Sequence, residues 1–139
     1  MLEGIHPLLS GELLHHLDDM GHSDAVVIAD AHFPAAAVAT RLVNLPGATT
    51  PDVLRAIRTV VPLDDSPSLD LMTSADGTVL EVQRELMDAA GTTPETTAFI
   101  DRFAYYDVAR AAFLVIRTGE TRTYGNAVLR KGVVGQPRP

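Results

Sequence analysis

Cysteine is absent from this chain of 139 residues. Its absence excludes disulfide frameworks, thiolate zinc sites and cysteine nucleophiles together. Tryptophan is also missing, and no apolar run reaches the roughly 18 residues that a membrane-spanning helix needs. The first residues carry no basic region leading into an apolar stretch, which is the pattern of a secretory signal. We therefore expect a cytoplasmic protein that does not enter a membrane.

Basic residues are scarce. The chain has 11 Lys and Arg against 18 Asp and Glu, which gives a formal net charge of -7. A surface that tracks nucleic-acid phosphates needs an excess of Lys and Arg, so nucleic acid is a poor candidate partner. Hydrophobic residues still make up 46% of the chain, too many for a disordered protein, and the length suits one domain. We expect that domain over residues 1–134 and a flexible tail over 135–139.

Helical and strand-like segments alternate along the chain. Ser10 is a suitable N-cap for a helix that stops near Gly21, and the continuous apolar run over 25–29 predicts a strand buried on both faces. Further helices are predicted from a cap at Thr50, over 79–90 and over 103–112, and further strands over 69–73, 97–100, 113–116 and 127–129. This alternation is typical of a single-domain layered α/β fold with a mostly parallel central sheet flanked by helices.

Two imidazoles and a carboxylate flank the strand predicted over 25–29. His22 precedes that strand, and Asp30 and His32 follow it. An imidazole can donate or accept a proton near neutral pH, and a neighbouring carboxylate can fix its tautomer or act as the complementary base. Acid/base chemistry is therefore one interpretation of this stretch. The other is structural: His22 belongs to a helix-to-strand turn, and Asp30 caps a loop.

The same three side chains could ligate a metal. Oxygen from Asp30 and nitrogen from His22 and His32 would suit zinc or iron. However, the sequence contains no His-x-His or His-x-x-x-His pair, and no cysteine can complete a site. We therefore expect no metal, and keep a metal centre as the minor alternative.

A second group of polar and aromatic residues follows later strands. Arg102 and Tyr106 lie where the strand predicted over 97–100 gives way to a helix, and Tyr124, Gly125 and Asn126 precede the last strand. Arginine presents several fixed donors to hydroxyl or carboxylate oxygens, and tyrosine combines a ring face with a hydroxyl tip. These groups suit a sugar or another polyol. The structural alternative is that the tyrosines belong to the core or to an interface and that residues 124–126 form a turn.

Six segments carry a combined pattern. In chain order they are GIHPLLS (4–10), ELL (12–14), MGH (20–22), IADAHFPA (28–35), RFAYY (102–106) and the stretch from GE to YGN (119–126). Together they resemble the RbsD/FucU family of sugar mutarotases, and the L-fucose mutarotase branch most closely. Two positions depart from the family pattern. Ser23 stands where the family commonly has glycine, and Asp107 stands where the fucose branch commonly has glutamate.

The resemblance implies a compact α/β subunit in a ring-based homo-oligomer, commonly a decamer of two pentamers, with sites near contacts between neighbouring subunits. It also implies a cofactor-free isomerase that interconverts the α and β anomers of L-fucose or a related monosaccharide by opening and closing the ring. Pyranose–furanose exchange passes through the same open chain. His22 corresponds to the family's proton donor, while Asp30, Arg102 and residues 124–126 correspond to sugar-binding positions.

A non-catalytic sugar-binding or transport-associated accessory protein is the alternative function. Binding needs only partners for the sugar's hydroxyl groups, whereas turnover needs a proton donor. Because the chain has both His22 and Asp30, we expect catalysis by these two residues, with His32 and Tyr106 as additional site candidates.

Overall fold

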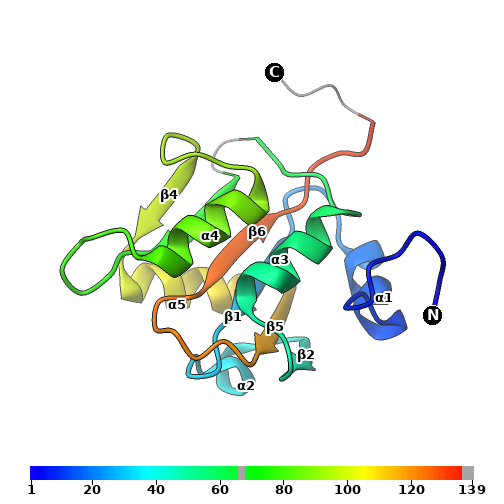
Figure 1. The fold of residues 1–139 in the computed structure, drawn as a ribbon, viewed down its shortest axis with the longest axis horizontal. Coiled ribbons are helices and arrows are strands. Elements are labelled where there is room, and N and C mark those ends of the chain that lie inside the picture. Colours follow the sequence, from blue (N-terminus) through cyan, green and yellow to red (C-terminus); the bar gives the residue numbers. More distant parts are fainter. Residues whose placement is uncertain (66–67, 136–139) are drawn as a thin grey trace.

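The structure is a computed structural model that describes residues 1–65 and 68–135. These residues form a single six-stranded sheet with helices around it (Figure 1). Its strands are β1 (Ala25–Ala29), β2 (Leu42–Leu45), β3 (Leu69–Met72), β4 (Thr97–Ile100), β5 (Leu114–Thr118) and β6 (Ala127–Arg130). They are ordered β2-β5-β1-β6-β3-β4. Strands β1 to β5 share one direction, and β6 is antiparallel to both of its neighbours. The predicted α/β fold with a mostly parallel sheet is confirmed.

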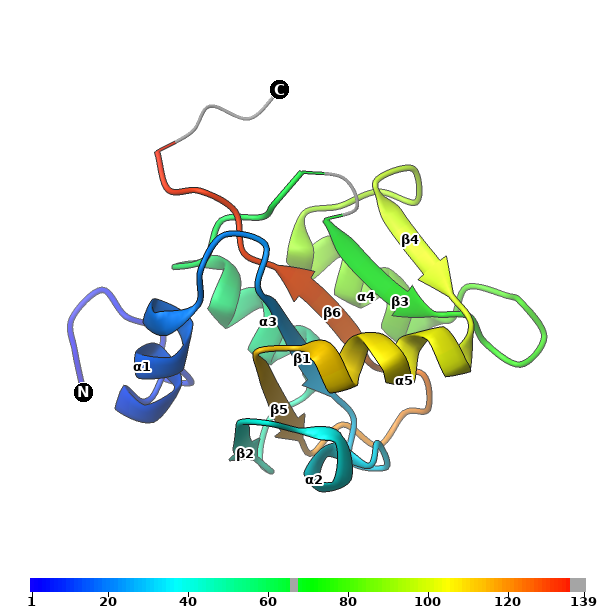
Figure 2. The ribbon, with the colours of Figure 1, turned by 180° about the vertical axis from the view of Figure 1, so that it is seen from behind.

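Helices cover both faces of this sheet. They are α1 (Gly11–Asp19), α2 (Ala35–Val38), α3 (Thr50–Arg58), α4 (Glu81–Ala90) and α5 (Arg102–Ala111). Helices α3 and α4 pack on one face with α1 beside them, and α2 and α5 pack on the other, as the two opposite views show (Figures 1 and 2). Successive strand residues point to opposite faces, so Val26 and Ile28 join the first core and Val27 and Ala29 join the second. Burial on both faces explains why β1 is apolar throughout.

Local capping decides where helices begin. Ser10 accepts a hydrogen bond from the amide three residues on at 3.2 Å, which confirms the predicted cap of α1. The cap predicted at Thr50 is wrong by one residue, because Thr49 accepts from the Asp52 amide at 3.3 Å. A cap at Thr50 would need the Val53 amide, which already donates to the Thr49 carbonyl oxygen. Thr50 is therefore the first helical residue.

The sequence does not predict α2 or β2. Helix α2 is a four-residue, alanine-rich turn, and β2 is a four-residue edge strand in which only Val43 is buried. Neither is long enough to carry a periodic pattern. Of the tail predicted over 135–139, only Gly135 falls within the described residues. No helix in the described ranges is long and apolar enough to cross a bilayer.

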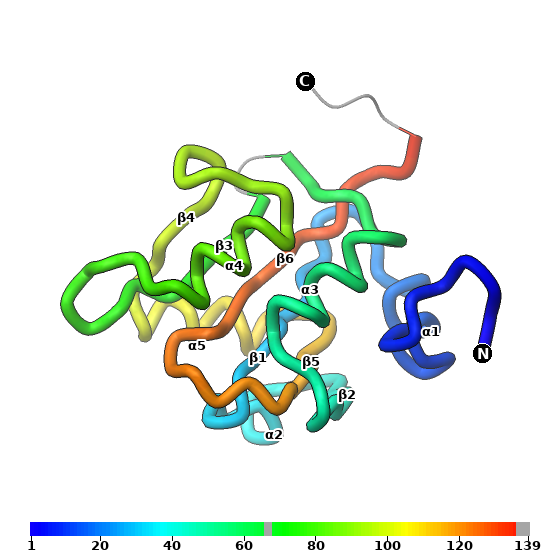
Figure 3. The backbone as a smooth tube through the Cα atoms, viewed as in Figure 1, coloured from blue at the N-terminus to red at the C-terminus, as the bar shows by residue number. Residues whose placement is uncertain are grey.

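The chain leaves β5, turns along the edge of the sheet and returns as β6 (Figure 3). Gly119 begins that turn and lies against the loop that follows β2. Its amide donates to the Ala48 carbonyl oxygen at 2.9 Å. A Cβ at position 119 would lie 2.0 Å from the carbonyl oxygen of Pro46. Residue 119 therefore cannot carry a side chain unless the backbone moves.

We expect Gly119→Ala to lower the free energy of unfolding by about 2 kcal/mol, because the added methyl group forces two packed backbone segments apart. Gly47→Ala is the matched control. A Cβ at position 47 meets nothing within 4 Å, and its expected effect is below about 0.5 kcal/mol. Urea denaturation measures both variants, and equal stability of the two would contradict the close contact at Gly119.

Candidate functional site

The strand directions place the predicted site residues at two opposite edges of the sheet. Parallel strands β1 and β4 end at the same edge, and antiparallel β6 begins there. This edge, which is formed by the carboxyl ends of the parallel strands and is named the carboxyl edge, therefore carries Asp30 after β1, Arg102 after β4 and residues 124–126 before β6. His22 precedes β1 and lies at the opposite edge, named the amino edge.

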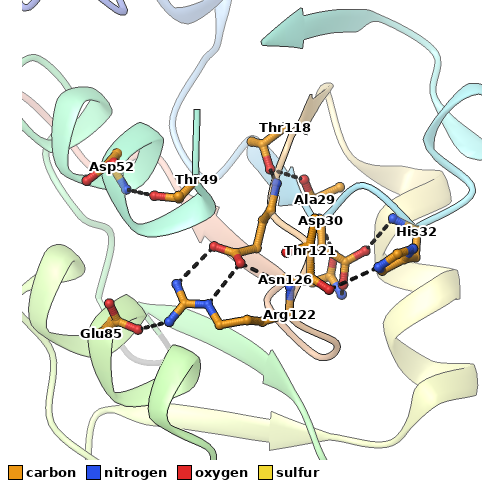
Figure 4. A network of polar contacts seen from close by, with 11 residues as sticks. Ala29, Asp30, His32, Thr49, Asp52, Glu85, Thr118, Thr121, Arg122 and Asn126 are labelled. Atoms are coloured by element: carbon orange, nitrogen blue, oxygen red, sulfur yellow. Dashed lines mark hydrogen bonds and ion pairs between the residues drawn. The ribbon is translucent and has the colours of Figure 1, made fainter. Parts of the chain in front are cut away.

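Asp30 and Asn126 hold each other at the carboxyl edge (Figure 4). The Asn126 amide nitrogen donates to Asp30 Oδ2 at 3.0 Å, and the Asn126 side-chain oxygen accepts from the Asp30 amide at 2.7 Å. Asp30 Oδ1 accepts from the amides of His32 and Phe33 at 3.0 and 2.8 Å. Both members of the pair are buried. Asp30 therefore caps the turn after β1 and also fixes the start of β6.

His32 joins the same turn to the loop between β5 and β6. Its imidazole Nε2 lies 3.0 Å from the carbonyl oxygen of Thr121, a hydrogen bond in which the ring nitrogen is the donor. The side chain is otherwise exposed. His32 thus lies beside Asp30, and one of its ring nitrogens donates a hydrogen bond to the loop between β5 and β6.

An aromatic group borders Asp30 on the α5 side. Phe33 stacks on Tyr106 with ring centroids 5.4 Å apart and ring planes 17° apart. Asp101 caps α5 by accepting from the amides two and three residues on, so Arg102 is the first helical residue. The Arg102 guanidinium lies 5.6 Å from the Tyr106 ring centroid, is exposed and has no carboxylate partner among the described residues. Its hydrogen-bond donors are available to a ligand.

Tyr105 lies beneath this group and is fully buried. Its hydroxyl oxygen has no hydrogen-bond partner within the described part of the chain. Burial raises the pKa of Tyr105 well above its usual range, and the negative charges of Asp30 and Asp70 raise it further. The hydroxyl therefore keeps its proton at neutral pH. The carboxylate of Asp70 pairs with Arg130 at 2.7 Å.

The loop of residues 119–126 contains an ion pair between a buried carboxylate, Glu120, and an exposed guanidinium, Arg122, that the sequence does not predict. Glu120 is 3% exposed. Arg122 donates to its carboxylate from Nε at 2.9 Å, from Nη2 at 3.0 Å and from its backbone amide at 3.1 Å, while Nη1 donates to Glu85 of α4 (Figure 4). These hydrogen bonds hold the pKa of Glu120 below its usual range and raise that of Arg122. Glu85 is 37 residues from Arg122, so no local pattern reveals the contact.

His22 has a carboxylate partner at the amino edge. Its Nε2 lies 3.0 Å from Asp64 Oδ1, and the Ser23 hydroxyl donates to Asp64 Oδ2 at 2.6 Å. These two contacts, that from Ser23 first, lower the pKa of Asp64. The His22 side chain is 60% exposed, so its other face is accessible. The sequence does not predict Asp64, because it lies 42 residues away.

Ser23 has a backbone conformation that favours glycine, the residue expected at this position from the family resemblance. Its φ is 69°, in the left-handed region that glycine adopts without strain. In this chain the hydrogen bond from Ser23 to Asp64 offsets part of that strain.

One chain does not bring His22 to Asp30. Strand β1 has five residues, and at about 3.3 Å per residue it alone separates them by roughly 16 Å. The metal set of His22, Asp30 and His32 is divided in the same way. Within the residues described, no three or more His, Cys, Asp or Glu side chains are gathered so that they could hold a metal ion.

Known proteins are similar to this chain over nearly its whole length. Residues 3–134 match the RbsD / FucU transport protein family. The fucose mutarotase of Streptococcus pneumoniae, solved in complex with L-fucose, is 34% identical, with a TM-score of 0.85 over 96% of this chain and 99% of that chain. FucU from Bifidobacterium longum is 35% identical, with a TM-score of 0.86 over 95% and 99%. RbsD of Bacillus subtilis, complexed with D-ribose, shares the fold at 23% identity, with a TM-score of 0.76 over 96% and 99%.

The ion pair of Glu120 makes stability depend on pH. The pKa of the Glu120 carboxyl is lower in the folded protein than in the unfolded chain. The ion pair therefore stabilises the folded protein fully above the unfolded-state pKa, and this stabilisation is lost as the pH falls through the lower, folded-state value. We expect Glu120→Gln to reduce the free energy of unfolding by about 1–3 kcal/mol at about pH 7, and this difference to shrink below about pH 4.5. Urea denaturation of both proteins across this range measures it. A difference that stays constant with pH would contradict the assignment.

Proposed function

Because the chain belongs to the RbsD / FucU transport protein family, we propose that it is a sugar mutarotase for L-fucose or a related monosaccharide. Mutarotation requires a proton on the ring oxygen and removal of the anomeric hydroxyl proton. The ring then opens to an aldehyde, the C1–C2 bond rotates, and reclosure returns both protons. Such a reaction needs proton transfer and no redox change. The observation that carries the proposal is the exposed imidazole of His22 held on Asp64.

Asp64 suits His22 to proton donation. The Asp64 carboxylate, 3.0 Å from Nε2, accepts a hydrogen bond from the Nε2 proton and so fixes the orientation of the ring, with Nδ1 on the side away from Asp64. Nδ1 is then the nitrogen free to donate its proton to the sugar's ring oxygen. After the transfer the neutral ring keeps its Nε2 proton on Asp64, so the ring is ready to take the proton back on closure. Asp64 acts through His22 and is a positioning residue.

The carboxyl edge supplies the sugar-binding groups. Asp30 accepts three hydrogen bonds, which leaves its carboxylate room for about one more donor. That donor is the anomeric hydroxyl, whose proton Asp30 accepts or orients. Arg102 offers unpaired donors to sugar oxygens, and Tyr106 presents part of a ring face. Tyr124 is half-buried next to Asn126, whose side chain holds the Asp30 carboxylate, and these residues with Gly125 complete the proposed binding set.

We infer that two subunits complete each site. His22 of one subunit meets the carboxyl edge of its neighbour, because β1 keeps the two edges of one chain apart. Such a contact joins different surfaces of the two copies, and its repetition forms a ring when the rotation between successive copies closes. The carboxyl edge also exposes Phe103, whose 80% exposed side chain is an apolar anchor for such a contact. A ring of this kind agrees with the expected decamer of two pentamers.

The accessory-binding alternative rests on one observation. All the proposed binding groups lie at the carboxyl edge, without His22. A protein that used this edge alone would bind sugar without turning it over.

We expect chelator-treated protein to accelerate anomer exchange of L-fucose in saturation-transfer NMR. His22→Ala should lose about 10²- to 10⁴-fold of that acceleration while calorimetry still detects binding, because proton donation is removed and the binding groups remain. His15→Ala is the matched control, since His15 is also exposed and pairs with an aspartate, Asp19, at 3.3 Å. The same assay with D-ribose and other monosaccharides ranks the substrates.

Two results would redirect this assignment. Full exchange by His22→Ala at saturating sugar favours the accessory-binding function. Activity that is lost with chelator and restored by zinc favours the metal alternative.

Shared sites predict complementation between inactive variants. His22→Ala and Asp30→Asn should each be nearly inactive alone. Unfolded together in equal amounts and refolded, they should regain about a quarter of wild-type exchange, because a quarter of random neighbouring pairs combine an intact His22 with an intact Asp30. Refolding each variant separately is the control. No recovery in a mixture shown by mass spectrometry to contain mixed oligomers would mean that each site belongs to one chain.

A further inference from the structure

The loop of residues 119–126 contains two charged residues with no role in the chemistry above. We propose that Glu120 and Arg122 are positioning residues that hold Tyr124 and Asn126 in the conformation that binds sugar. This inference rests on the proposed function, because it assigns the loop to the same site. The main-chain contacts of Glu120, the side-chain contacts of Arg122 and the backbone of Tyr124 support it independently.

Hydrogen bonds connect the main chain of Glu120 to the residues on both sides of Asp30. Its carbonyl oxygen accepts from the Ala31 amide at 2.8 Å. Its amide donates to the Thr118 hydroxyl oxygen at 3.1 Å, and that hydroxyl donates to the Ala29 carbonyl oxygen at 2.8 Å. Glu120, which anchors the Arg122 side chain, is thus held by hydrogen bonds to the residue after Asp30 and, through Thr118, to the residue before it.

Arg122 has no nitrogen left without a partner. Nε and Nη2 bind the two oxygens of Glu120, and Nη1 binds Glu85 of α4. This fork fixes the guanidinium in one orientation. Arg102, in contrast, has no carboxylate partner among the residues described. The two arginines therefore differ in role: Arg102 is free to contact sugar, and Arg122 ties the loop to α4.

The loop is held in a strained conformation next to these contacts. Tyr124 has a φ of 61°, which is unfavourable for an aromatic residue and persists only where the surroundings enforce it. At Gly125 a Cβ would lie 3.0 Å from both the Arg122 carbonyl oxygen and Glu120 Cγ. The loop is therefore folded tightly onto its own ion pair. Asn126, the next residue, is thereby brought to Asp30.

Arg122→Gln removes both arms of the fork and tests the proposal. We expect the KM and the calorimetric Kd for L-fucose to rise about tenfold, while exchange at saturating sugar stays within about threefold of wild type. Arg122→Lys keeps the charge but loses the fork, so its Kd should rise less, by about threefold. Glu85→Gln leaves Glu120 paired and should give a similar, small rise. These two variants decide the matter if Arg122→Gln does not fold.

Arg55→Gln is the matched control, because it breaks an exposed Arg–Asp pair on α3 and should leave exchange and binding unchanged. Variants of Arg122 and Glu85 that bind L-fucose as tightly as Arg55→Gln would overturn the inference. An equal fall in exchange at saturating sugar would also overturn it, by giving Arg122 a part in the chemistry. Wild-type protein that neither binds nor exchanges any tested sugar would overturn the proposed function as well.

Discussion

The direction of β6 decides where the polar groups of the site lie. A strand that enters an otherwise parallel sheet in the antiparallel sense must begin at the edge where its neighbours end. The chain leaving β5 therefore turns back at once, and its loop stays beside the end of β1. If β6 ran parallel to its neighbours, Asn126 would lie at the amino edge, and the length of a strand would separate it from Asp30. The pair of Asp30 and Asn126, and the loop contacts around Glu120, depend on this single reversal.

The fold could be predicted from the sequence where burial or helix capping leaves a local pattern. The strand Ala25–Ala29 has the predicted bounds, because burial on both faces requires an unbroken apolar run. Strand β2 lies at the sheet edge with one buried residue, so its four residues resemble a loop. The cap of α3 was displaced by one residue because Thr49 and Thr50 carry the same hydroxyl, and only the amide that each can reach distinguishes them.

The candidate site could be predicted only in part, because some of its contacts join residues far apart in the sequence. Residues at strand ends are gathered by sheet topology, and this topology places at the carboxyl edge Asp30, Arg102 and Asn126, which the sequence singles out in separate segments. Asp64 and Glu85 were not singled out, because each meets its partner across more than 30 intervening residues. Sequence proximity also misleads at His22 and Asp30. They are eight positions apart, yet the extended strand between them is the conformation that separates them most.

Strand β6 has a further consequence for how the molecule is made. It comes last of the six strands in chain order, yet it lies between β1 and β3 and joins the group β2-β5-β1 to the pair β3-β4. During synthesis these two parts expose unpaired strand edges until residues 127–130 emerge, and exposed edges can pair with other nascent chains. Chaperones that shield open strand edges until β6 is synthesised should therefore raise the yield of native protein.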